Sequence, residues 1–124
     1  MRLSIDFDYR LYRLAALCWM ALLFYLSSQT SLPVPGLFSG QDKIIHAVFY
    51  AVLGFFIARG LSPWQGGLSW TQIGVVTLLV ALYGASDEFH QSFVAGRSSS
   101  GADLIADALG GFVAAYMLRD RRTT

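Results

Sequence analysis

The sequence predicts an all-α integral membrane protein, a bundle of about four transmembrane helices in a single domain covering residues 1–124. Three observations support this fold class. Hydrophobic residues make up 55% of the chain and charged residues only 14%, whereas about a quarter of the residues in a soluble domain are usually charged. The mean hydropathy is positive, at +0.50. Four apolar stretches are separated by turn-rich connections, and none has the alternating polarity of a barrel strand.

Each apolar stretch is interpreted as a helix, because a backbone in hydrocarbon must satisfy its own hydrogen bonds. The strictly apolar runs are residues 14–26, 44–58, 73–85 and 104–118. They are shorter than the roughly 20 residues that a spanning helix needs, so buried core helices are an alternative interpretation. Extension into the flanking residues gives predicted helices at about 11–28, 42–59, 71–91 and 102–119. This extension places ionisable residues at the membrane boundary or just inside it.

The connections between these helices, residues 31–41, 60–67 and 96–101, are rich in glycine, proline or serine, which favours turns. Trp64 and Trp70 flank the middle connection, as aromatic residues at a membrane interface often do. The first apolar run also has features of a signal peptide, because arginines precede it and Ser27 and Ser28 follow it. Three further apolar runs favour a retained first helix.

The basic residues predict the orientation of the bundle. An even number of helices places both termini and the connection after the second helix on one side. Seven of the nine basic residues belong to that side. They are Arg2, Arg10, Arg13, Arg59, Arg119, Arg121 and Arg122. Because basic residues near membrane helices favour the cytoplasm, we expect both termini to lie inside.

The opposite side of the bundle collects most of the acidic residues and both histidines. Its polar residues are Asp42, Lys43, His46, Asp87, Glu88, His90, Gln91, Arg97, Asp103 and Asp107. Residues four apart share one face of a helix, so these positions form three stripes. The stripes are Asp42/His46/Tyr50, Tyr83/Asp87/Gln91 and Asp103/Asp107/Gly111. Three stripes on one membrane side predict a common polar pocket that faces outward.

Some of these acids have a local structural explanation. Asp42 and Asp103 lie at predicted helix starts, where a carboxylate stabilises free N–H groups, and the spacing from Ser100 to Asp103 resembles a capping box. Asp87 and Glu88 lie near a helix end, where negative charge opposes the helix dipole. They therefore need a cation or a shared proton. The candidate partners are Arg97, Lys43 and His46.

His46 and Asp107 interrupt apolar runs. Ionisable residues inside membrane segments are costly and usually face a partner or a wet cavity, although a neutral hydrogen-bonded core histidine is an alternative for His46. Beside Asp107, small residues recur at every fourth position of the fourth helix, which predicts close packing against a neighbouring helix. These residues are Ala102, Ala106, Gly110 and Ala114.

The spacing of these residues resembles the VanZ-like family over about residues 42–115. The first motif is Asp42-Lys43-x-x-His46-x-x-x-Tyr50-x-x-x-Gly54. The second is Asp87-Glu88-x-x-Gln91-x-Phe93, followed by Gly96-Arg97 and Asp103-x-x-x-Asp107-x-x-Gly110. Two positions depart from the commonest family pattern, because Ala95 replaces a frequent proline and Asp107 a frequent asparagine. The resemblance implies a compact protein of the bacterial cytoplasmic membrane. The member that gave the family its name is associated with reduced susceptibility to the glycopeptide teicoplanin.

Three functions are compatible with the polar zone. In an enzyme acting on a lipid-linked or cell-envelope substrate, Asp87 or Glu88 is the general base, His46 its acid partner and Arg97 an anchor for an anionic head group. A binding module uses the same pocket without turnover, for a lipid-linked precursor or a glycopeptide. A structural or transport helper uses the polar residues as an ion-pair network that locks the helices. The binding residues we predict are Asp42, Lys43, Tyr50, Gln91, Arg97, Asp103 and Asp107.

Other site classes have less support in the sequence. No basic run is interleaved with aromatic residues, which argues against a nucleic-acid partner and leaves membrane lipids as the expected surroundings. The single cysteine, Cys18, excludes an intrachain disulfide. Nitrogen and oxygen ligands are present, at Asp42/His46 and at Asp87/Glu88/Gln91, but no compact zinc signature occurs. We therefore predict no metal centre, and the sequence determines neither a cofactor nor an oligomeric state.

Overall fold

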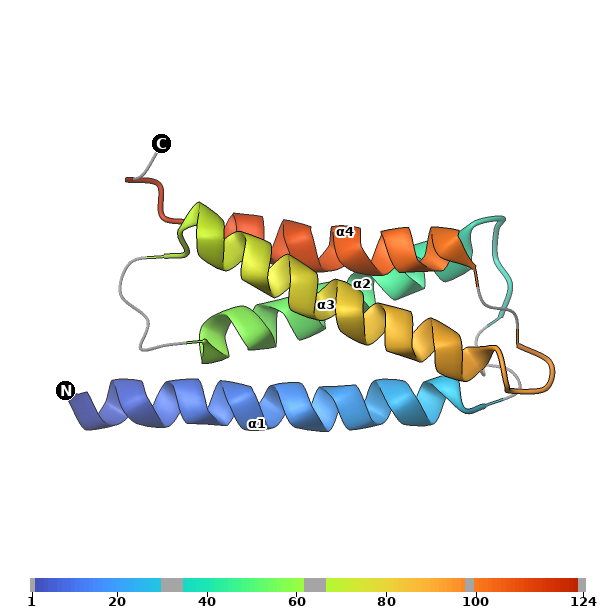
Figure 1. The fold of residues 1–124 in the computed structure, drawn as a ribbon, viewed down its shortest axis with the longest axis horizontal. Helices are drawn as coiled ribbons and strands as arrows, with labels where there is room; N and C mark the ends of the chain where they lie inside the picture. Colours follow the sequence, from blue (N-terminus) through green and yellow to red (C-terminus); the bar gives the residue numbers. More distant parts are fainter. Residues whose placement is uncertain (1, 30–34, 62–66, 98–99, 123–124) are drawn as a thin grey trace.

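A computed structural model describes residues 2–29, 35–61, 67–97 and 100–122, and side chains from residue 9 onward. Within these residues the chain forms four α-helices and no strand, which confirms the predicted all-α bundle. The helices are α1 (Arg2–Ser27), α2 (Gln41–Gly60), α3 (Trp70–Gln91) and α4 (Gly101–Met117). The start of α1 and the end of α4 lie at the same end of the bundle as the end of α2 and the start of α3 (Figure 1). The ends of α1 and α3 and the starts of α2 and α4 lie at the opposite end.

The helix boundaries follow from local sequence signals. α1 begins at Arg2, well before the predicted start at residue 11, because no glycine or proline interrupts residues 2–10. α2 follows Gly40, whose positive φ of 86° favours glycine. α3 begins with a capping box in which the Ser69 hydroxyl accepts a hydrogen bond from Gln72 N and the Gln72 side chain accepts one from Ser69 N. This capping box was not predicted from the sequence.

Glycines allow α2 and α4 to approach closely. A Cβ atom on Gly110 would collide with the carbonyl oxygen of Ala47 in α2, and one on Gly54 would lie 2.9 Å from the Cα of Gly111. Gly111 in turn packs against Val80 of α3. The backbones of α2 and α4 therefore meet almost without intervening side chains, and their contact is the most extensive between any two helices. Of the small residues predicted to pack in α4, Ala106 and Gly110 are buried and Ala102 is exposed.

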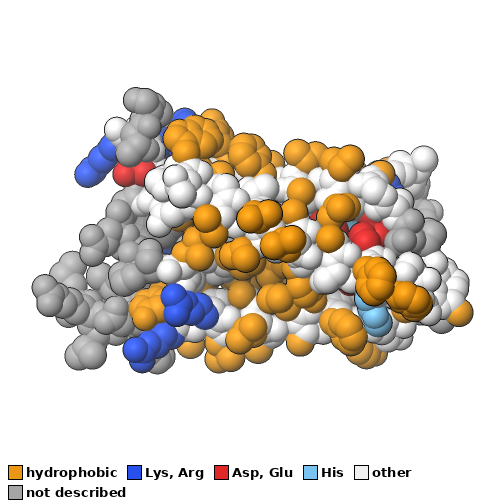
Figure 2. All heavy atoms as spheres, in the orientation of Figure 1, with side chains coloured by type: hydrophobic (Ala, Val, Ile, Leu, Met, Phe, Trp, Pro, Cys, Tyr) orange, Lys and Arg blue, Asp and Glu red, His pale blue; other side chains and the backbone are white. Residues whose placement is uncertain are grey.

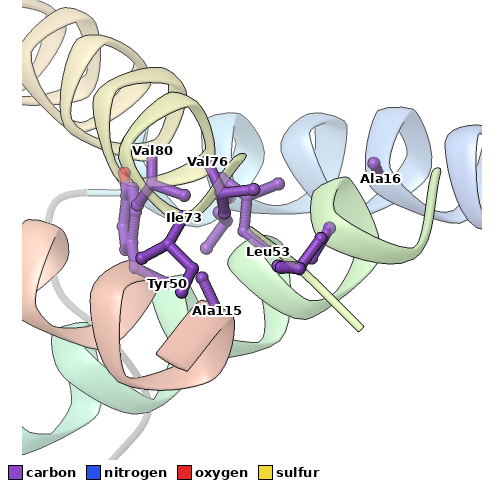
Figure 3. Close-up of a cluster of buried hydrophobic side chains, with 10 residues drawn as sticks. Ala16, Tyr50, Leu53, Ile73, Val76, Val80 and Ala115 are labelled. Atoms are coloured by element: carbon purple, nitrogen blue, oxygen red, sulfur yellow. The ribbon is translucent and has the colours of Figure 1, made fainter. Parts of the chain in front are cut away.

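The apolar core lies mainly between α2, α3 and α4 (Figure 3). Its largest fully buried side chains are Tyr50, Leu53, Ile73, Val76 and Val80, and Ala115 of α4 closes one side. Ala16 and Leu23 extend the core to α1. This core holds the polar ends of α2, α3 and α4 in fixed positions relative to one another.

At the end that holds both termini, the backbone following α4 pairs with the backbone preceding α3. Leu68 N donates to Leu118 O at 2.9 Å, and Asp120 N donates to Leu68 O at 2.8 Å. Trp70 packs against Tyr116 with ring centroids 6.0 Å apart, and the Arg119 guanidinium lies over both rings. Trp64 and most of the connection predicted at residues 60–67 lie outside the described residues.

Large apolar side chains cover much of the outer surface (Figure 2). Two helical segments in the described residues are long and apolar enough to cross a membrane, Tyr9–Ser27 and Gln41–Gly60. α3 has 22 residues and α4 has 17, and neither combines the length and the apolar character that a membrane-crossing helix needs. The number of membrane crossings therefore stays a prediction.

Candidate functional site

The polar residues gather at the end of the bundle opposite the termini. The first turns of α2 and α4 meet the last turns of α3 there, and acidic and histidine side chains mark this end in Figure 2. Arginine and lysine side chains lie mainly at the other end of the same view. The stripe on α2 runs from surface to core: Asp42 is exposed, His46 is partly buried and Tyr50 is fully buried.

Lys43 connects α2 to the start of α4. Its Nζ lies 2.8 Å from Oδ2 of Asp42 and 2.6 Å from Oδ1 of Asp103. Asp103 is buried, while Asp42 and Lys43 remain open to solvent. Half of the predicted capping box forms, because the Ser100 hydroxyl accepts a hydrogen bond from Asp103 N at 3.1 Å. The Asp103 carboxylate binds Lys43.

His46 lies between the two deeper acids. Its Nδ1 hydrogen-bonds to Oδ1 of Asp107 at 2.8 Å and lies 4.0 Å from Oε1 of Glu88. The other Glu88 oxygen, Oε2, accepts a hydrogen bond from Ser100 N at 3.1 Å. Asp107 has no exposed surface, and its second oxygen packs against Gly84, where a Cβ would lie only 2.9 Å from it. Glycine at this position therefore leaves room for the carboxylate between α3 and α4.

Tyr50 connects the core to Asp87. The tyrosine hydroxyl donates to Oδ2 of Asp87 at 2.7 Å, and both residues are buried. The Tyr50 ring is parallel to the His46 ring, with centroids 6.2 Å apart. Tyr50 was not among the partners predicted for Asp87 from the sequence, although its hydroxyl donates a hydrogen bond to this carboxylate in the structure.

A small cavity of about 30 Å³ lies beside these residues. His46, Tyr50, Asp87, Gln91 and Arg97 form its polar wall. The rest of the wall comes from α1 and from apolar residues of α2, namely Leu23, Leu26, Ser27, Ile45 and Phe49. A cavity of this size accommodates about one water molecule. The contribution of α1 was not predicted, because an unbroken apolar run does not reveal which of its faces meets a polar site.

His90 lies apart from this cavity. Its Nε2 is 2.9 Å from the hydroxyl of Ser28, and its ring stacks on Phe24 with centroids 4.4 Å apart. Both partners belong to the end of α1 and the residue that follows it. His90 therefore attaches α3 to α1, and it does not join the cluster around His46.

Several buried carboxylate oxygens have no hydrogen-bond partner among the described residues. They include Oδ1 of Asp87, Oε1 of Glu88 and Oδ2 of Asp107. Asp103 Oδ1 also lacks a hydrogen bond by geometry, but its ion pair with Lys43 satisfies it. Buried charges are costly unless they are paired. These unpartnered carboxylate oxygens could accept a proton, bind a cation or accept a hydrogen bond from a ligand.

Together the fold and the site define a small helical protein with a buried centre of four carboxyl groups, an imidazole and a phenol at one end of the bundle. The VanZ/LLP1 family profile matches residues 12–120 of this chain, and the protein belongs to that family. Neither the curated proteins nor the solved structures gave a match. The family match covers every residue of the centre and confirms the family predicted from the motif spacing.

Proposed function

We propose that this protein crosses the bacterial cytoplasmic membrane four times, with both termini inside, and binds or modifies a lipid-linked envelope ligand at its outer face. The low burial of the apolar helices supports the membrane part of the proposal. Only 17% of the most apolar 18-residue segment of α1 is buried inside the bundle, and only 28% of the corresponding segment of α2. The core helix of a soluble protein would be mostly buried, so these exposed apolar surfaces favour contact with lipid.

The cavity beside Asp87 and His46 is the observation that carries the ligand part of the proposal. It joins the two acid–base groups to Arg97 and to apolar residues of α1. An anionic lipid head group is matched by this combination, since Arg97 supplies a guanidinium and α1 a surface for an acyl chain. The cavity is too small for a whole head group, so only one reacting atom or a water molecule is expected to enter it.

The chemical roles follow from the hydrogen bonds. Asp87 is the general base, because Tyr50 orients one of its oxygens and the other is free to accept a proton. His46 is its acid partner, and the hydrogen bond to Asp107 fixes the orientation of the imidazole. Glu88 is the alternative base, held at Oε2 by Ser100 N. Asp42, Lys43 and Asp103 then hold the rim of the site.

Envelope lipid analysis tests this function. A deletion strain is complemented with the wild type, with Asp87→Asn or with His90→Gln as a matched control at the same end of α3. We expect the deletion and Asp87→Asn to change the content of lipid-linked envelope precursors, whereas His90→Gln restores it. Wild-type lipid content in the deletion strain would contradict modification. Saturable binding of the unchanged lipid by purified protein would then identify a binding module.

We also propose a link to glycopeptides, because the member that gave the family its name is associated with teicoplanin susceptibility. This link gives a second test of the same site. In a host that is sensitive to teicoplanin, the inhibitory concentration is measured with the wild type and with Arg97→Gln. Wild type should raise this concentration, and Arg97→Gln should abolish the increase because the anionic ligand loses its anchor. Equal values for both strains would separate this protein from glycopeptide susceptibility.

A structural helper is the second candidate function, and a specific observation favours it. Three polar contacts each join α2 to another helix: Lys43 with Asp103, His46 with Asp107 and Tyr50 with Asp87. If locking the helices were the whole role, Asp87→Asn would lower the abundance of the protein and its phenotype in parallel. Normal abundance with a lost phenotype would exclude this function.

A further inference from the structure

We propose that His46, Glu88 and Asp107 bind one divalent transition-metal ion. Three helices supply the three ligands, which were not grouped together from the sequence. One nitrogen or oxygen atom of each residue lies within 4.8 Å of the others, among the residues the structure describes. Metal binding is independent of the proposed function, whereas a role for the ion in holding an anionic ligand rests on it.

The distances fit a shared ion after small side-chain movements. His46 Nδ1 lies 2.8 Å from Asp107 Oδ1 and 4.0 Å from Glu88 Oε1. Metal bonds of about 2.1 Å put neighbouring ligands roughly 3 Å apart and opposite ligands roughly 4.2 Å apart. The hydrogen bond between His46 and Asp107 would then be replaced by two bonds to the ion. This requires His46 to be neutral and both carboxyl groups to be ionised.

Glu88 supplies the observation that distinguishes a site from a mere group of acids. Its side chain is nine-tenths buried, and its Oε1 has no hydrogen-bond partner among the described residues. Ser100 N holds the other oxygen, Oε2, so that Oε1 is left on the side of His46. Such support of the second oxygen is the way in which ligating carboxylates are commonly oriented. An unpartnered acceptor beside a histidine therefore faces the place where the ion would bind.

The charges at this end of the bundle also favour a cation. Four buried carboxyl groups, Asp87, Glu88, Asp103 and Asp107, lie near one another, and Lys43 compensates Asp103. Arg97 and Asp87 both line the wall of the cavity, and His46 lies close to Asp107 and Glu88. Ionised carboxylates in a buried site require compensation, and a divalent ion would neutralise Glu88 and Asp107 together.

The ligand types select among ions. One imidazole with two carboxylates suits Zn²⁺ or Mn²⁺ better than a soft thiolate-binding ion, and three protein ligands leave positions for water or a ligand oxygen. The nearby cavity, which His46 also lines, would hold that ligand oxygen. The ion would then act as a Lewis acid on an anionic head group that Arg97 anchors, and it would replace His46 as the acid partner of Asp87.

Calorimetry on the full chain in detergent, stripped with a chelator, tests the proposal with Zn²⁺ and Mn²⁺ as probes. We expect saturable binding of one ion per chain. Asp107→Asn, Glu88→Gln and His46→Gln should each weaken it at least tenfold, while His90→Gln, the matched control for the histidine variant, leaves it unchanged. Equal affinity for wild type and for the Glu88 and Asp107 variants, or no saturable binding, would overturn the proposal.

X-ray absorption at the zinc edge gives a readout that does not depend on whether a variant folds. For wild-type protein we expect one imidazole nitrogen and otherwise oxygen ligands. A sulfur ligand would implicate Cys18, and a second imidazole would implicate His90, so either result overturns the site. Loss of metal binding with intact lipid binding would contradict only the role of the ion in holding the ligand. Metal binding without any effect on envelope lipids would contradict only the proposed function.

Discussion

α4 and α1 both pack against α2, but in opposite ways. α4 meets α2 through glycines, so that the backbones touch at Gly110 and Ala47. α1 meets α2 through large aromatic side chains, with ring centroids 5.6 Å apart for Trp19 and Phe49 and 5.8 Å apart for Tyr12 and Phe55. Side chains can change rotamer to absorb a change in spacing, whereas two backbones in contact cannot. The three helices that carry the carboxylates thus form the rigid part, and α1 is an adjustable wall.

This difference in packing separates the helices that build the polar site from the helix that closes the cavity. The contacts of His46, Tyr50 and Lys43 with acidic residues lie within α2, α3 and α4. α1 contributes Leu23, Leu26 and Ser27 to the cavity wall. Changes within the three-helix unit should therefore alter both stability and the site. Changes in α1 should alter mainly access to the cavity and the strength of its own attachment.

Gly110→Ala should have the largest effect, because the new Cβ would collide with the backbone carbonyl of Ala47. Overpacking against backbone should lower the free energy of unfolding by about 3 kcal/mol. Gly74→Ala is the matched control in α3, since nothing lies within 4 Å of its added Cβ. Thermal unfolding in detergent measures both, and similar stability of the two variants would refute the rigid α2–α4 contact.

The paired tyrosine variants Tyr50→Phe and Tyr83→Phe compare the two regions directly. Tyr50→Phe leaves Asp87 Oδ2 buried without its donor, which should cost about 2 kcal/mol. Tyr83→Phe removes a hydrogen bond at 2.5 Å to the carbonyl of Met20 in α1, in a half-buried position, and should cost about 1 kcal/mol. Equal losses in a denaturation series would show that both attachments contribute alike.

Lys43→Met tests the ion pair at the rim of the site. It leaves the buried Asp103 carboxylate without its cation, and because Lys43 is partly exposed we expect a moderate loss of about 1–2 kcal/mol. The double variant Lys43→Met/Asp103→Leu should recover most of this loss, since apolar replacement of both partners is often neutral. A double-mutant cycle with no coupling would show that the pair does not stabilise the three-helix unit.

Trp19→Phe, like Tyr83→Phe, should have a small effect. It keeps an aromatic ring against Phe49 and Phe56 but removes the hydrogen bond from Nε1 to Phe49 O at 2.9 Å. A loss of about 1 kcal/mol in unfolding free energy is expected, with no change in binding of Zn²⁺ to the centre. Altered metal binding in this variant would show that α1 influences the carboxylate cluster.

The sequence predicts the four helices well and the pairing of side chains poorly. Spacing by four residues groups Asp103 with Asp107 and Asp87 with Gln91, and the structure buries all four. Such spacing defines a face of one helix but not the rotation of that helix against its neighbours. The hydrogen bond from Tyr50 to Asp87 and the position of Glu88 near His46 depend on that rotation. The part of the cavity wall that α1 forms could not be predicted either, because most residues of that helix are apolar.

The short apolar length of α4 bears on the membrane arrangement proposed above. Its large exposed apolar side chains extend only from Ile105 to Met117, about 18 Å at the helical rise, whereas the hydrocarbon core of a bilayer is about 30 Å thick. In the membrane arrangement proposed above, this hydrophobic mismatch would be relieved by local thinning or by tilt of the helix. Thinning would lower the outer head groups toward Asp103 and Asp107. The membrane itself would then deliver polar lipid groups to the carboxylates.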